Sequence, residues 1–108
     1  MRSDENKFGL TERTMQTISE IFEKYSEIEE VIMFGSRAMG NYKLGSDLDL
    51  AIMNIGVDDK TIMHLKNDFE ESSLPISVDL VNFPDLKHPD FIDHIERVGK
   101  VFYRKRKI

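Results

Sequence analysis

The stretch from Gly35 to Ile52 reads GSRAMGNYKLGSDLDLAI, and it decides the fold. It follows a continuous apolar run at residues 31–34, and such a run ending at a glycine predicts a buried strand. The glycines, serine and asparagine of residues 36–46 predict a loop, with room for one helical turn. Residues 47–53 (DLDLAIM) predict a second strand. These two strands form the centre of the expected sheet.

Helical and strand patterns alternate on both sides of this centre. Apolar spacing predicts a third strand over residues 76–81, helices over residues 11–26 and 89–98, and a helix that follows a cap at Asp58 or Asp59 and ends at about Glu71. Residues suited to helix ends flank these segments, namely Thr11, Asp58 or Asp59, Pro89 and Gly99. Residues 101–103 are expected to dock as a short extended end. The predicted order is therefore α-β-loop-β-α-β-α, an α/β or α+β sheet layered with helices.

Length and composition limit the class of protein. A chain of 108 residues with 40% apolar and 32% charged residues predicts one folded domain over residues 1–108, with flexible ends at 1–9 and 104–108. No apolar run approaches the ~20 residues that span a bilayer, and the first residues lack a secretory apolar segment. The absence of cysteine excludes disulfides, thiolate zinc sites and a cysteine nucleophile. We therefore expect a cytoplasmic protein without membrane contact.

Charge is unevenly distributed along the chain. Residues 1–103 hold 11 of the 15 basic residues and all 20 acidic ones, a net charge of −9. Such a body repels nucleic-acid phosphates, so direct DNA binding is not expected. The basic tail at residues 104–107 is interpreted either as a solvated end or as a contact for phosphate or an acidic partner.

Two acids lie two residues apart in the second predicted strand. Asp47 and Asp49 point to one sheet face, while Leu48 and Leu50 point to the other. Their repulsion is relieved by a hard divalent cation such as Mg²⁺, which prefers carboxylate oxygens. Asp79 is a single acid within the third predicted strand. If this strand lies beside the second one, all three carboxylates can converge.

The loop before these acids carries groups suited to phosphate. Gly35 permits close backbone approach, Ser36 offers a hydroxyl and N–H groups, and Arg37 offers a planar cationic donor. Other interpretations stay open: Ser36 can simply cap a helical turn, Arg37 can form a surface ion pair, and Asp79 can be a paired structural acid. Together, a phosphate loop and three acids indicate a nucleoside triphosphate site.

The spacing Gly-Ser, ten residues, Asp-x-Asp, with a later strand acid, resembles the DNA polymerase beta nucleotidyltransferase superfamily. The sequence motif GSRAxG…SDLDLAI and the short length of the chain resemble those of the minimal, MNT-type branch of this superfamily. Many relatives have a second arginine where this chain has Met39.

That resemblance implies a polymerase-beta-like palm, a small mixed sheet of at least three strands backed by helices. It implies that Asp47, Asp49 and Asp79 bind two Mg²⁺ ions and are catalytic. It further implies nucleotide or phosphate contacts from Gly35, Ser36, Arg37 and Ser46, with ATP as the donor.

The resemblance also implies a partner, a helical HEPN-domain protein that acts as toxin to this antitoxin and receives AMP on a tyrosine. Two alternatives are kept: a non-catalytic module that neutralises the partner by contact, and transfer to a small molecule such as an aminoglycoside with a separate substrate-binding subunit. The acceptor and the base preference are left open. His88 and His94 lie six residues apart and are not expected to form a metal site.

Overall fold

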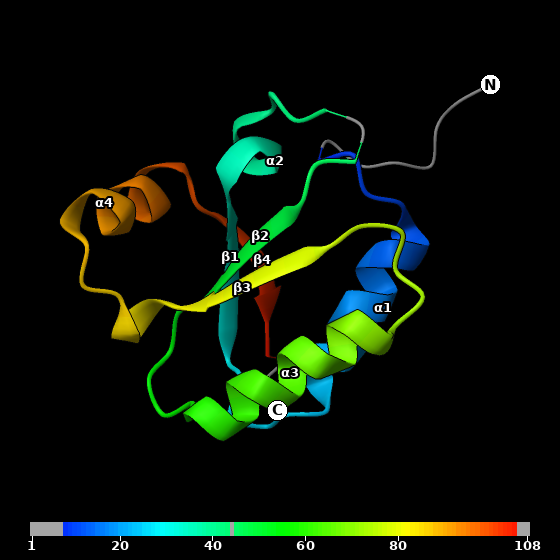
Figure 1. Cartoon of the computed structure of the whole chain (residues 1–108), viewed down its shortest axis with the longest axis horizontal. Helices are drawn as coiled ribbons and strands as arrows, with labels where there is room; N and C mark the ends of the chain where they lie inside the picture. The colour runs from blue at the N-terminus through cyan, green and yellow to red at the C-terminus, as the bar shows by residue number, and fades with distance from the viewer. Residues whose placement is uncertain (1–7, 44, 106–108) are drawn as a thin grey trace.

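The computed structural model describes residues 8–43 and 45–105 (Figure 1). Its elements, in chain order, are α1 (Glu12–Glu23), β1 (Glu30–Phe34), α2 (Gly35–Met39), β2 (Leu48–Ile52), α3 (Asp59–Glu71), β3 (Val78–Asn82), the 3-10 turn η1 (Phe83–Asp85), α4 (Pro89–Val98) and β4 (Lys100–Arg104). The predicted order of helices and strands is confirmed. The loop after β1 contains the single helical turn that the sequence allowed, and η1 was not predicted.

The strands form one mixed sheet in the order β3-β2-β1-β4. β1 is antiparallel to both β2 and β4, whereas β2 and β3 are parallel and are joined by α3. Parallel neighbours need such a crossover connection, and the amphipathic segment before residue 72 supplies it. The expected mixed sheet is confirmed, and the extended end predicted at residues 101–103 is a full strand of it.

The two faces of the sheet are covered differently. Helices α1 and α3 cover one face, where the larger apolar cluster includes Phe22, Leu50 and Leu65, each fully buried. Helix α4 covers part of the other face, where a smaller cluster includes Phe34 and Ile95. Figure 1 shows α4 on the side of the sheet away from α1 and α3. Alternating residues of β2 therefore contact two different environments.

Side-chain caps fix the starts of α1 and α3. The Thr11 hydroxyl accepts a hydrogen bond from the Thr14 N–H at 3.1 Å, and the Asp58 carboxylate accepts one from the Thr61 N–H at 2.9 Å. Both predicted caps are thus confirmed, with Asp58 rather than Asp59 in the second case. α1 is shorter than the predicted 11–26 because Lys24 already caps its C-terminal end.

Parts of the predicted flexible ends are held in place. The Phe8 carbonyl accepts a hydrogen bond from Arg37, Arg104 pairs with Glu30 within the sheet, and the Lys105 N–H donates to the Glu29 carbonyl. These contacts involve residues at both of the predicted flexible ends. Residues 1–7 and 106–108 of the predicted ends lie outside the described residues.

None of the helices within residues 8–43 and 45–105 has both the length and the apolar character that crossing a bilayer requires.

Candidate active site

The parallel pairing of β2 and β3 brings two of the predicted acids together. Asp49 and Asp79 are directly paired across these strands, so their side chains leave the same face of the sheet about 4.8 Å apart at the backbone. Asp47 directly precedes β2 on the same strand path. The neighbouring pairs, Leu48 with Val78 and Leu50 with Leu80, lie on the α3 face. The condition on which convergence of the acids depended, that these two strands are neighbours, is met.

Asp49 is the least exposed acid of this group. Its side chain is half-buried, whereas Asp47 and Asp79 are exposed. Burial raises the pKa of Asp49 above its usual range, and the carboxylates of Asp79 and then Asp47 raise this pKa further. The three acids therefore share one electrostatic environment with excess negative charge.

Gly35 lies next to the Asp49 carboxylate. Phe34 is paired with Asp49 across β1 and β2, and Gly35 follows with a φ of +76°, a conformation that favours glycine. A Cβ at Gly35 would overlap Oδ2 of Asp49. The absence of a side chain at Gly35 therefore leaves room for the Asp49 carboxylate next to the start of α2. Ser36, the following residue, is half-buried.

Arg37 is buried, and its guanidinium contacts backbone carbonyls. Its side chain is only 4% exposed, and its guanidinium donates hydrogen bonds to the carbonyls of Phe8 (2.8 Å) and Ser46 (3.0 and 3.2 Å). It also lies over the Tyr42 ring, 5.0 Å from the ring centroid. A buried guanidinium with these carbonyl partners holds the loop in place.

Ser46 closes the loop that leads to the acids. Its hydroxyl accepts a hydrogen bond from the Lys43 N–H at 2.8 Å, and its N–H donates to the Lys43 carbonyl at 2.9 Å. Since its carbonyl is also the Arg37 acceptor, Ser46 fixes the direction in which the chain enters β2. Its position directly before Asp47 is thus set by three hydrogen-bonding groups.

His94 is a residue of this site that the sequence did not reveal. It lies on α4, half-buried, with its ring edge-on to Phe34 and the ring centroids 6.1 Å apart. Phe34 is the cross-strand partner of Asp49, and His94 lowers the pKa of Asp49 against the effect of the other acids. Only the position of α4 over this sheet face, a long-range feature, brings the imidazole here.

The acids have the right chemistry for a hard divalent cation, but they are not arranged as a ready-made site. In the part of the chain that the structure describes, no three His, Cys, Asp or Glu side chains are close enough to hold a metal ion as they stand. The exposed carboxylates of Asp47 and Asp79 change rotamer readily, and the raised pKa of Asp49 shows the negative charge that a cation would offset. The donor set therefore fits Mg²⁺.

Comparison with solved structures supports the fold. The chain is similar to a structure described as a toxin-antitoxin with AMP-PNP (TM-score 0.67, 20% identity, covering 85% of this chain and 74% of that one). It is also similar to a structure of the tri-AMPylated HEPN toxin of Shewanella oneidensis in complex with MNT antitoxin (TM-score 0.62, 18% identity, covering 86% and 71%). At these identities, the likeness establishes the arrangement of helices and strands.

Sequence comparison gives a nearer relative. The "Probable protein adenylyltransferase MntA" of Haemophilus influenzae is 41% identical over 75 residues, which are 68% of this chain and 65% of that protein. The match thus spans just under two thirds of the relative's length. The family model described as polymerase beta, nucleotidyltransferase, matches residues 16–108, a range that includes all three acids and the Gly35 turn. The chain belongs to the polymerase beta nucleotidyltransferase family.

Proposed function

We propose that this chain is a Mg²⁺-dependent nucleotidyltransferase that transfers AMP from ATP to a tyrosine hydroxyl of a HEPN-type partner protein, as the antitoxin of a toxin-antitoxin pair. The observation that carries the proposal is the direct pairing of Asp49 with Asp79 beside the Gly35 turn. In a nucleotidyltransferase, acids paired in this way would act together as ligands of the metal ions.

The relatives support the finer parts of this proposal. The Haemophilus influenzae protein is named as a protein adenylyltransferase, and the Shewanella oneidensis structure holds an AMPylated HEPN toxin together with an MNT antitoxin. AMP as the transferred group and a HEPN protein as the acceptor are therefore the pair to test first for this chain.

The three acids have distinct roles in the proposed reaction. Asp47, Asp49 and Asp79 would hold the ions, which would supply stabilisation of the charge that develops at the α-phosphate. The exposed Asp79 would in addition accept the proton of the attacking hydroxyl as its oxygen bonds to the α-phosphorus and pyrophosphate leaves. Gly35 and Ser36 would admit the triphosphate at the start of α2. Arg37 and Ser46 would position this loop.

Transfer of label from α-labelled ATP to a HEPN-type partner protein tests the proposal. The wild-type chain with Mg²⁺ should label the partner, and mass spectrometry should place AMP on a tyrosine. The double variant Asp47→Asn/Asp49→Asn should lose more than about 100-fold of the labelling rate, because it removes the charge that the ions require. The matched control Asp90→Asn, an exposed acid in the first turn of α4, should label like wild type.

The same experiment separates the other classes of function. Neutralisation of the partner is measured in parallel with labelling, in wild type and in the double variant. Undiminished neutralisation with no labelling by the wild-type chain would contradict the enzyme and indicate a contact-based module. Labelling of an aminoglycoside in place of the protein would move the acceptor to a small molecule. Normal transfer by the double variant would contradict the role given to Asp47 and Asp49.

A further inference from the structure

The outer edge of the sheet is open next to the acid pair. β3 is an edge strand, and the Ser77 carbonyl accepts a hydrogen bond from the Leu48 N–H at 2.9 Å. Because backbone groups alternate in direction along a strand, those of Ser77 and Asp79 point toward β2, and those of Val78 and Leu80 point outward. No residue within 8–43 or 45–105 forms a hydrogen bond with these outward groups.

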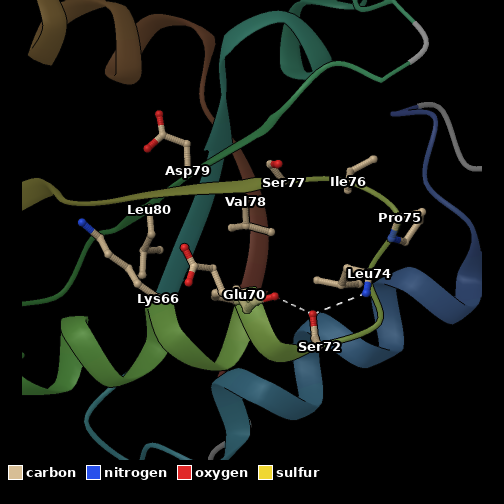
Figure 2. A pocket seen from close by; sticks show the side chains of 11 residues that line it. Lys66, Glu70, Ser72, Leu74, Pro75, Ile76, Ser77, Val78, Asp79 and Leu80 are labelled. Carbon is tan, nitrogen blue, oxygen red and sulfur yellow. Dashed lines mark hydrogen bonds between the residues drawn. The ribbon is translucent and has the colours of Figure 1, made fainter.

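A groove of about 460 Å³ runs along this edge between β3 and α3 (Figure 2). Lys66 and Glu70 of α3 form one wall, and Ile76 and Val78 contribute apolar surface to the other. The two charges on the α3 wall are of opposite sign, so the groove has no cationic surface for a polyphosphate or a nucleic-acid strand. Its chemistry, alternating backbone donors and acceptors beside apolar side chains, fits an extended polypeptide.

The groove borders the strand that carries Asp79. Asp79 belongs to its lining, and Figure 2 shows the Asp79 carboxylate on the face of β3 opposite to Glu70 and Leu80. A segment added to β3 would lie about 4.8 Å from it, one strand spacing. Successive side chains of that segment would alternate between the α3 groove and the Asp79 face. A hydroxyl on the second face would thus come to the acid while its neighbours filled the groove.

We infer that the open edge of β3 receives an extended segment of the partner protein as an added strand, which carries the acceptor hydroxyl to Asp79. This inference rests on the proposed function for the identity of the occupant. It predicts that the acceptor residue is flanked on both sides in its sequence by residues able to lie against Ile76 and Val78. It also predicts which amide protons of this chain the partner protects.

Amide hydrogen exchange of the whole chain, measured by NMR with and without saturating HEPN partner, tests this inference. The Val78 and Leu80 amides should exchange rapidly in the free protein and at least about tenfold more slowly in the complex. The Asp79 and Val81 amides serve as internal controls, because they face β2 and are protected in both states. Unchanged exchange at Val78 and Leu80 in the complex would overturn the inference, as would equal protection by MgATP alone.

A pair of variants tests the same edge by function. Val78→Pro removes an outward N–H at the first residue of an edge strand, where proline is tolerated, and Val78→Ala keeps that N–H. Val78→Pro should raise the KM for the partner about tenfold and leave the thermal shift produced by MgATP unchanged, while Val78→Ala, which keeps the N–H and trims only the apolar surface, should raise the KM by no more than about threefold. Wild-type KM in Val78→Pro would contradict the added strand.

The outcomes separate this inference from the proposed function. Protection at Val78 and Leu80 by a partner that never receives AMP would support the docking edge and overturn the transfer reaction. AMP transfer to a partner that leaves both amides unprotected would do the reverse.

Discussion

The two faces of the sheet differ in what they do with the same strands. On the α1 and α3 face, Phe22 packs against Phe69 and Tyr103 with ring centroids 5.4 and 5.3 Å away, and Leu50 of β2 is fully buried. On the α4 face, the next residue back along β2 is Asp49, half-buried among like charges. One face supplies stability, and the other supplies charge that costs stability in the absence of a cation.

This contrast shows how a small domain accommodates an acidic site. The period-two alternation of β2 separates carboxylates from core side chains by a single residue, so the core need not be interrupted. Stability changes and activity changes should therefore separate by face.

The largest expected effect is the loss of a core ring. Phe22→Ala should reduce the free energy of unfolding by about 3–5 kcal/mol, because it leaves a cavity among aromatic neighbours. Phe91→Ala, at a half-buried position that contacts Phe34 on the other face, should cost less than about 2 kcal/mol. Urea unfolding curves measure both values, and equal losses would contradict the assigned difference between the faces.

The next effect separates activity from stability at two glycines. Gly35→Ala and Gly40→Ala each place a side chain at a positive φ (+76° and +84°), which costs about 1–2 kcal/mol in either case. A Cβ at Gly35 also displaces Asp49, whereas one at Gly40 meets open space. Gly35→Ala should therefore lose about 100-fold in AMP transfer, and Gly40→Ala should stay within a few fold of wild type. Similar rates in the two variants would contradict the claim that Asp49 needs a residue without a side chain at position 35.

The smallest expected effect concerns Asp68 and Asp49, because their replacement by asparagine should change stability in opposite directions. The Tyr25 hydroxyl and then Lys24 lower the pKa of Asp68, so its stabilisation is present above pH 3.8 and is lost as pH falls through the folded pKa. The pKa of Asp49 is raised, so the folded state favours its protonated carboxyl. The resulting contribution to the stability of the fold is greatest below pH 3.8 and is lost as pH rises through the folded pKa. At pH 7 without Mg²⁺, Asp68→Asn should cost about 1 kcal/mol and Asp49→Asn should slightly raise Tm.

Thermal melts from pH 2.5 to 7 in EDTA measure both differences, which should fade at the acidic end. A lower Tm for Asp49→Asn at pH 7 would contradict the crowding of like charges. Addition of Mg²⁺ should then raise the Tm of wild type and leave that of Asp49→Asn nearly unchanged.

Local patterns predicted most of the elements because each has a strong period and clear caps. The acids at positions 49 and 79 were predictable because each interrupts an apolar strand, and a parallel crossover aligns them. The burial of Arg37 and the approach of His94 were not predictable, since both depend on contacts between distant segments, Phe8 in one case and Phe34 in the other. Sequence spacing carries no information about which carbonyls or rings such side chains meet.

The parallel pairing of β2 with β3 also governs when the site can exist during folding. Asp49 and Asp79 are thirty residues apart in the chain, and they meet only after the intervening segment has closed its loop. An antiparallel β1–β2 unit formed early would hold Asp47 and Asp49 without the third acid. Incompletely folded chains would therefore lack catalytic competence, and activity would report the finished tertiary structure.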